Sequence, residues 1–272
     1  MITRNIYRVI FILLILHCKL ELSLAQIYEV SISSLKQNYL YKDSCWLGTN
    51  KQLCQLNFYD QKKQLIVKGY IKNSMLDSTW LLYNNENGNL CAEMSYKEGK
   101  LNGAYKVYTK KGRLFQVLNF DDGIPHGKLV TYSLFAPYRI LESFEINHGV
   151  LDGKVQKFHE GVLSMQMTFK NGKADGNLKL FNSQNELEGQ VIYKNGLLVS
   201  NLVYYSNNVK NSELVLDNKK QVFIERKKYN KNNGRLRKTT PISTDVGFKN
   251  PIELFMNTGA PLYDLLEKMT KQ

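Results

Sequence analysis

The sequence predicts an all-β protein, an elongated antiparallel β-meander of about 24-residue hairpin repeats with a short C-terminal helix. Three observations predict it. Pairs of small residues recur at intervals of 25, 24, 26, 23 and 24 residues. An aromatic residue stands five positions after each pair, and the segments between turn residues are too short for helices. Self-similarity at a fixed period is the sequence signature of a repeat array.

Residues 1–25 have the pattern of a secretory signal peptide. Arg4 and Arg8 precede the apolar run "VIFILLIL", and the small residues of "SLAQ" fit a signal-peptidase site that leaves Gln26 as the first mature residue. The apolar run is far shorter than the roughly 20 residues that a membrane-spanning helix needs. The pattern therefore predicts export to a periplasmic, cell-surface or extracellular location.

Residues 26–49 form a lead-in before the repeats, and they contain the first of three cysteines in the mature chain. Because export exposes cysteines to oxidising conditions, Cys45 and Cys54 are candidates for a disulfide that closes a short loop. The equal alternative is that Cys45, Cys54 and Cys91 are small buried apolar residues. The chain has no CxxC pair and no histidine cluster, so no zinc site is expected.

The repeat array is predicted over residues 50–239. Six clear repeats run from Ser74/Ser78 to Gly196/Ser200, and the positions of Asn50 and Lys220 mark a degenerate repeat at each end. Each repeat holds two runs of about six to eight residues bounded by Gly, Asn or Asp, which is typical of a β-hairpin. Glycine suits these turns because it adopts a positive φ without strain. The repeat turn glycines are Gly99, Gly103, Gly123, Gly127, Gly149, Gly153, Gly172, Gly176 and Gly196.

Two positions in each repeat carry large residues, two and five places after the second small residue. They are three apart, so in a regular strand they face opposite sides of the sheet. Either both faces are partly buried or a bulge intervenes. We expect a twisted, curved sheet in which aromatic columns stack from repeat to repeat on one face, with Tyr108 against Tyr83 and Tyr132. The repeat aromatics are Trp80, Tyr83, Tyr105, Tyr108, Tyr132, Phe158, Phe181, Tyr205 and Tyr229.

The segments "YKEGKLNGAYKVY", "FKNGKADGNLKLF" and "YKNGLLVSNLVYY" share one frame of paired small residues followed by aromatics. This frame resembles the MORN-repeat variant of bacterial proteins described as YwqK-type antitoxin components, over about residues 50–236. The resemblance implies an elongated β-sheet scaffold with a protein-binding role. It also implies, as an alternative, an antitoxin-like immunity component that neutralises a partner toxin.

The residues themselves favour a binding protein over an enzyme. His126, His148 and His159 stand in or beside glycine turns, and no catalytic signature accompanies them. We therefore expect no enzymatic activity, no cofactor and no metal. A repeat array exposes a long regular surface, which suits an extended partner better than a small substrate. The predicted function is an exported scaffold for protein–protein interaction, with a protein partner that the sequence does not name.

A basic block between Lys219 and Lys238 supports an alternative function. It holds nine Lys or Arg residues and the single acidic residue Glu225. Such a block suits an anionic surface of lipid headgroups or acidic polysaccharide, and nucleic acid is the least favoured partner of an exported protein. Lysines also protect an exposed sheet edge, which is the other interpretation. The candidate polyanion contacts are Arg226, Lys227, Lys228, Arg235, Arg237 and Lys238.

Residues 240–272 leave the repeat pattern and are predicted to form a helical cap or tail. Leucine and methionine recur there at helical spacing, in positions 262, 265, 266 and 269, and Pro261 suits a first helical turn. The expected role is to cover the end of the sheet, and the alternative is a partner-binding helix.

Overall fold

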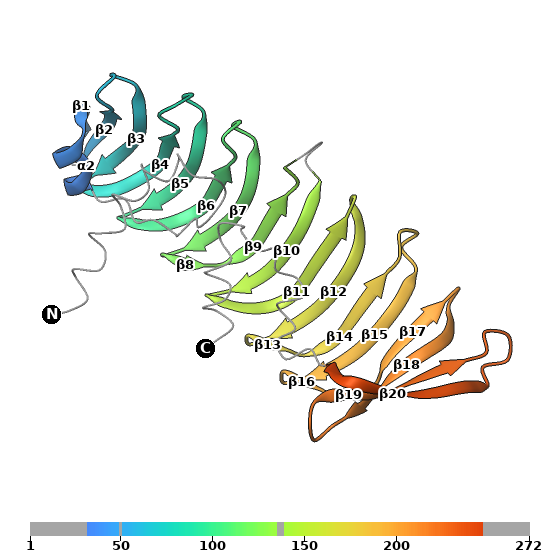
Figure 1. Cartoon of the computed structure of the whole chain (residues 1–272). Coiled ribbons are helices and arrows are strands. Elements are labelled where there is room, and N and C mark those ends of the chain that lie inside the picture. Colours follow the sequence, from blue (N-terminus) through green and yellow to red (C-terminus); the bar gives the residue numbers. More distant parts are fainter. Residues whose placement is uncertain (1–31, 49–50, 135–138, 247–272) are drawn as a thin grey trace. The chain divides into compact units, whose positions relative to one another are not determined.

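The computed structural model describes residues 32–48, 51–134 and 139–246. The chain divides into two compact units, one before and one after position 138. In each unit nearly every described residue belongs to an antiparallel sheet whose consecutive strands lie side by side (Figure 1). The predicted all-β meander is therefore confirmed. The predicted signal peptide and the predicted helix near Pro261 lie outside the described residues.

In the first unit a short helix precedes nine strands that pair in chain order. β8 and β9 both pair with β7, so they are two halves of one interrupted strand. The elements are α2 (Ile32–Asn38), β1 (Leu40–Gly48), β2 (Lys51–Tyr59), β3 (Leu65–Lys72), β4 (Met75–Tyr83), β5 (Leu90–Lys97), β6 (Lys100–Tyr108), β7 (Leu114–Asp121), β8 (Ile124–Pro125) and β9 (Gly127–Tyr132).

The second unit consists of eleven described strands that also pair in chain order. Two interrupted strands occur here, β13 with β14 and β16 with β17. The elements are β10 (Ile140–Asn147), β11 (Val150–His159), β12 (Val162–Lys170), β13 (Lys173–Ala174), β14 (Gly176–Phe181), β15 (Leu187–Lys194), β16 (Leu197–Leu198), β17 (Leu202–Ser206), β18 (Val209–Asp217), β19 (Val222–Tyr229) and β20 (Leu236–Val246).

The first small residue of each repeat lies in a two-residue hairpin turn. In the turn between β5 and β6, Glu98 has a φ of 50° and Gly99 a φ of 84°. Two successive positive φ angles define the type I′ turn, whose twist matches that of paired strands. All six clear repeats begin with such a turn: Asn73-Ser74, Glu98-Gly99, Asp122-Gly123, His148-Gly149, Asn171-Gly172 and Asn195-Gly196. The prediction of positive φ at these turns is confirmed.

These turns also connect one repeat to the next. The backbone N–H of Gly99 donates to the carbonyl oxygen of Leu76 in the preceding repeat, at 2.8 Å. The same bond joins Gly196 to Ala174 at 2.8 Å. Because the bond recurs at the same position of the repeat, the period is set by backbone geometry as well as by side-chain packing.

The second small residue sits in a bulge. Met94 pairs with Tyr105 and Tyr96 pairs with Leu101, so three residues of β6 stand opposite the single residue Ser95. Gly103 lies in this bulge with a φ of 101°, and a Cβ there would approach the Ser95 Cβ to 3.2 Å. Glycine is required here by both backbone conformation and space.

The resemblance between "YNNENGNL" and "YNKNNGRL" extends to their turns. Gly88 donates to the carbonyl oxygen of Asn84, and Gly234 donates to that of Asn230, each at 2.8 Å. The side-chain oxygen of each asparagine also accepts a backbone N–H two residues later. Asparagine suits this position because its side chain mimics a backbone turn.

The core lies along one face of each sheet, here called the inner face. It is formed by the residue two places after each small pair together with its partners on neighbouring strands, all at most 4% exposed. In the first unit these are Leu56, Trp80, Met94, Tyr105, Leu118 and Leu129. In the second unit they are Phe144, Val155, Met167, Leu178, Val191, Leu202 and Leu214.

The expected stacking of aromatics from repeat to repeat is wrong. Tyr105 is buried on the inner face, whereas the Tyr108 hydroxyl donates to Glu93 on the opposite, outer face. Equivalent residues of successive repeats are also two strands apart, about 9.6 Å, which exceeds the 4.5–7 Å of an aromatic pair. The ring contact of Tyr105 is instead with Phe120 on the adjacent strand, at 6.1 Å between centroids.

Regular structure at both ends of the array was not predicted. The lead-in contains α2, whose Leu35 is fully buried, and β1. On β1, Cys45 is bonded to its cross-strand partner Cys54. The disulfide candidate is thus present in the structure, and the Cys91 thiol donates to the Asn89 carbonyl oxygen at 3.9 Å. At the other end β20 continues to Val246, beyond position 240 where the tail was expected to begin.

Candidate functional site

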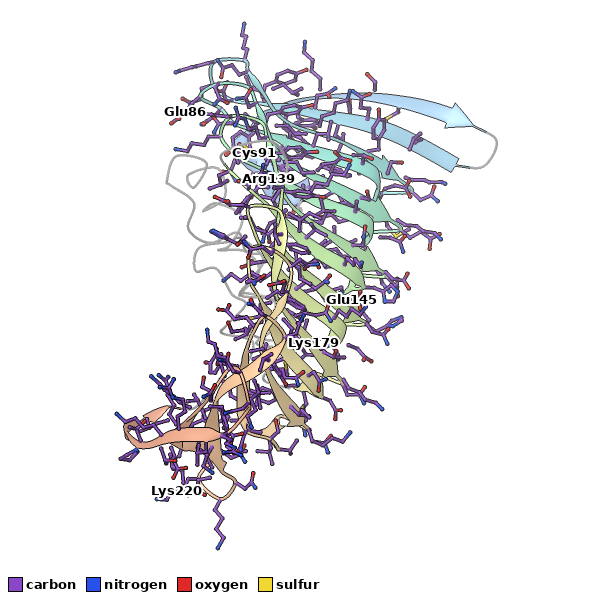
Figure 2. The ribbon with its side chains drawn as sticks, turned by 90° about the vertical axis from the view of Figure 1, so that its right-hand side faces the viewer. Glu86, Cys91, Arg139, Glu145, Lys179 and Lys220 are labelled. Atoms are coloured by element: carbon purple, nitrogen blue, oxygen red, sulfur yellow. A yellow bond between two sulfur atoms is a disulfide. The ribbon has the colours of Figure 1, made fainter. Side chains whose placement is uncertain are left out.

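The outer face of the second unit carries a continuous polar row, here called the glutamine row. Its members come from five strands, β10, β11, β12, β14 and β15, and each is the direct cross-strand partner of the next. Lys179, the member from β14, is labelled in Figure 2. The row consists of Ser143, Gln156, Gln166, Lys179 and Gln190.

Hydrogen bonds between side chains hold part of the row in place. The Ser143 hydroxyl donates to Gln156 Oε1 at 3.4 Å, and Gln156 Nε2 donates to Gln166 Oε1 at 3.1 Å. Gln190 Nε2 donates to the Tyr205 hydroxyl at 2.9 Å. An amide has two acceptor and two donor positions, so each of these glutamines keeps capacity for a further hydrogen bond.

Half-buried aromatic residues flank the row toward the turns that connect β11 to β12 and β14 to β15. Phe158 and Phe181 stand two residues after Gln156 and Lys179, so strand alternation places them on the same outer face. Polar groups that specify orientation, beside apolar groups that supply area, are typical of a protein-binding surface.

The outer face of the first unit is organised differently, around an ion pair. Lys106 Nζ lies 2.8 Å from one carboxylate oxygen of Glu93, and the Tyr108 hydroxyl donates to the other at 3.1 Å. Burial and the negative charge of Glu93 raise the pKa of Tyr108 to about 12, so this tyrosine stays neutral. Both carboxylate oxygens of Glu93 are engaged within this cluster, and its charge is balanced by Lys106, which suits a structural role.

A similar cluster lies on the outer face near the end of the array. Glu213 is 8% exposed and accepts hydrogen bonds from Lys210 at 2.8 Å, from Asn201 at 3.4 Å and from the Tyr229 hydroxyl. Burial alone would raise the pKa of Glu213, but these hydrogen bonds hold it below the usual value. The Lys210 ammonium also lies over the Tyr229 ring, 4.4 Å from its centroid.

The predicted basic block is divided between the two faces of the sheet. On β19, Arg226 is the cross-strand partner of the inner-face residue Leu214, and Lys228 lies on the same face two residues later. On β20, Lys238 is the direct partner of Lys228. These three residues, Arg226, Lys228 and Lys238, are exposed and are called the basic triad below.

The other members of the block lie elsewhere. Lys227 belongs to the outer face, where its Nζ is 3.5 Å from Glu225. Arg235 lies in the turn before β20, and Arg237 is the extra residue of a bulge within β20. Sequence reasoning treated the six residues as one surface because it grouped them by charge. It did not apply strand alternation to Arg226, Lys227 and Lys228, and the bulge at Arg237 is visible only in the strand pairing.

One ionisable group of the second unit is buried on the inner face. Glu142 is 1% exposed, one of its carboxyl oxygens has no hydrogen-bond partner, and the other lies 3.9 Å from Lys157 Nζ. Burial raises the pKa of Glu142 to about 7, although Lys157 opposes the shift. Proton loss from this group therefore costs stability.

We expect Glu142→Gln to remove a pH dependence of unfolding. Between pH 4.5 and about 7 the folded chain keeps a proton that the unfolded chain loses, so stability falls as pH rises through this window. At pH 8 the variant should exceed the wild type by about 3 kcal/mol, because the pKa differs by about 2.5 between the folded and the unfolded chain and one pKa unit equals about 1.4 kcal/mol. Near pH 4.5 the two should be similar.

Urea denaturation at both pH values tests this expectation, with Glu188→Gln as the control because Glu188 is exposed. The control should not alter the pH dependence. An equal gain at both pH values for Glu142→Gln would show that the Glu142 carboxyl does not titrate in this window.

Within residues 32–48, 51–134 and 139–246, no group of His, Cys, Asp and Glu side chains is arranged to hold a metal ion. The helix in the described part of the chain, α2, has seven residues. No helix among the described residues is long and apolar enough to cross a membrane. Comparison with known proteins found no matching family model and no matching curated protein.

The glutamine row was missed by sequence reasoning. The repeat alignment followed the small and aromatic positions, whereas Gln156 corresponds to Lys106, Lys179 and Val203 in other repeats. Gln166 and Gln190 lie on the second strands of their hairpins, which the alignment did not compare. The alternation of apolar and polar residues in these strands, as in Met165-Gln166-Met167-Thr168, was the available signal.

Proposed function

We propose that the protein is a non-enzymatic β-repeat scaffold that binds a protein partner across the outer face of its second unit. The glutamine row is the observation that carries this proposal. The row spans five strands, and its glutamine amides keep hydrogen-bonding capacity for a partner. The Glu93 and Glu213 carboxylates, in contrast, are held in ion pairs within the chain.

The spacing of the row favours an extended partner. Adjacent strands are about 4.8 Å apart, so the row repeats a polar group at that interval along the sheet. Side chains on paired strands are held more rigidly than those on loops, so little conformational entropy is lost on binding. Phe158 and Phe181 add apolar area beside the row.

The same proposal includes membership of the MORN-repeat variant and export through the N-terminal segment. The period of about 24 residues, the type I′ turns and the bulge glycines support the first. The basic and apolar pattern of residues 1–25 supports the second. A repeat array of this kind presents a regular surface without needing a catalytic centre.

The experiment uses the mature chain as bait, identifies the retained partner by mass spectrometry and then measures its affinity for variants. We expect Gln166→Ala combined with Gln190→Ala to weaken binding about tenfold or more, since each lost interfacial hydrogen bond costs about 1 kcal/mol. Gln184→Ala is the matched control because Gln184 is exposed in the turn between β14 and β15. Equal affinity of the double variant and the control would contradict the proposal.

A further inference from the structure

A second binding surface lies on the inner face at the end of the array, where the repeat pattern changes. The position two places after the small pair holds a buried apolar residue in each of the six clear repeats, at most 2% exposed. The degenerate first repeat places Leu56 there, 1% exposed. The last repeat places the exposed Arg226 there instead. At this position of the repeat the inner face therefore changes from apolar to cationic on β19, whereas Phe223 at the start of the same strand is still buried.

The arrangement of the basic triad is electrostatically unfavourable in the chain alone. Lys228 and Lys238 are direct cross-strand partners, and Arg226 stands two residues from Lys228 on the same face. Like charges directly opposite each other in a sheet are destabilising. Among the described residues no carboxylate forms an ion pair with any of the three, whereas Lys227 on the other face pairs with Glu225.

Protection of the sheet edge does not account for the triad. Lysines on an edge strand do prevent unwanted pairing, and this explains Lys238 on β20. Arg226 and Lys228 lie on β19, which β18 and β20 cover on both sides. They guard no edge. A polar cap that served solubility alone would also mix charges of both signs.

The backbone of β20 supplies the second half of the surface. β20 pairs with β19, and no other described strand pairs with it. The stretch Leu236–Thr240 thus presents N–H and C=O groups toward the edge, up to Pro241, which has no N–H to donate. An added strand in this stretch places every second side chain on the inner face next to Lys238, with Cβ atoms about 5 Å apart.

We propose that an extended acidic peptide segment adds a strand to β20 and places its carboxylates over the basic triad. Main-chain hydrogen bonds along Leu236–Thr240 give affinity, and the charges select the sign of the partner's side chains. Arg226 is the cross-strand partner of Thr240, whose side chain is short, so no bulky side chain of β20 stands between Arg226 and an added strand. This site is separate from the glutamine row and does not depend on it.

The test measures fluorescence anisotropy of short labelled peptides with the full chain. The main probe alternates Glu with Val, and a second probe alternates Glu with Pro. The Glu–Pro peptide has the same charge but cannot donate ladder hydrogen bonds from its prolines. We expect the Glu–Val peptide to bind about tenfold more tightly than the Glu–Pro peptide, and more weakly as salt is raised.

Two triple variants with the same change in net charge locate the site. Arg226→Gln with Lys228→Gln and Lys238→Gln should weaken Glu–Val binding about tenfold. The matched control replaces three exposed turn residues by Gln, namely Lys219, Arg235 and Lys220, which extends away from the ribbon in Figure 2. It should weaken binding by no more than about twofold, through long-range charge alone.

A charge-reversed variant, Arg226→Glu with Lys228→Glu and Lys238→Glu, should prefer a Lys–Val peptide. That preference would show that the loss of Glu–Val binding is not a loss of folding. Equal weakening by the two Gln triples would overturn the proposal. So would equal binding of the Glu–Pro and Glu–Val peptides, because it would make strand addition unnecessary. Binding of heparin with no binding of the Glu–Val peptide would also overturn it and would assign the triad to an acidic polysaccharide.

Discussion

Trp80→Ala should lower the free energy of unfolding by about 3–5 kcal/mol, the cost of truncating a large buried aromatic side chain. Trp80 is fully buried on the inner face, and its indole N–H donates to the Tyr70 carbonyl oxygen at 2.9 Å. The substitution removes the ring, leaves a cavity between β3 and β5, and removes this hydrogen bond to the Tyr70 carbonyl oxygen. Urea denaturation followed by far-ultraviolet circular dichroism measures the loss.

The control for this variant is Tyr83→Ala in the same repeat. Tyr83 belongs to the other aromatic position and is half-buried on the outer face, so we expect a loss of only about 1–2 kcal/mol. Since each repeat contacts mainly its neighbours, hydrogen exchange in Trp80→Ala should accelerate first in β3, β4 and β5. If the two variants lost equal stability, the assignment of the two positions to opposite faces would be wrong.

The period of the array could be predicted from sequence because each turn demands a residue that tolerates a positive φ. Gly99 and Gly103 are four apart because Gly99 ends the type I′ turn before β6 and Gly103 occupies a bulge within β6. Those local requirements do not depend on distant parts of the chain. The spacing of these turn residues also predicts the strand lengths, and the short turns predict antiparallel pairing.

The assignment of faces could not be obtained in this way. Tyr105 and Tyr108 are both aromatic and both recur with the period, yet only Tyr105 is in the core. A spacing of three puts the two tyrosines on opposite faces of a regular strand, but it does not say which of the two faces is buried. That depends on the partner strands, where Tyr105 lies between Met94 and Leu118. The faces of the basic residues on β20 likewise depend on the pairing with β19 and on a bulge at Arg237.

The glutamine row and the basic triad both result from the register between strands that are neighbours in the chain, and the row extends over several such pairings in succession. Ser143 and Gln190 are 47 positions apart in the numbering but belong to one row of the sheet. No single repeat contains the row, and repeat alignment alone does not find it. Strand propensities differ little between polar residues of this kind, so the preference of each residue for a strand does not reveal either surface.

Gly69→Ala should also destabilise the protein strongly, by about 2–3 kcal/mol, which is typical of overpacking in a close-packed core. Gly69 is buried on β3 and does not adopt a positive φ, so the backbone itself would accept alanine. A Cβ at this position would overlap the Trp80 indole ring, which packs directly on the glycine. The expected loss therefore comes from this single contact. Thermal and urea denaturation measure it.

The matched control is Gly88→Ala, because a Cβ at Gly88 meets no atom within 4 Å. Gly88 has a φ of 70°, so alanine there should cost about 1 kcal/mol through backbone strain without any clash. A loss at Gly69 no greater than that at Gly88 would show that the indole ring does not lie against β3.

The core must lie on the inner face if the outer face is to be available to a partner. A double-mutant cycle between Gly69→Ala and Trp80→Leu tests this placement of the core, since it isolates the contact between the two residues. We expect the smaller leucine to accept the added methyl group, so that Gly69→Ala costs almost nothing in the Trp80→Leu background. The coupling free energy should then be about 2 kcal/mol. Additive losses, with no coupling, would contradict the packing of Trp80 on the inner face and with it the proposed use of the outer face.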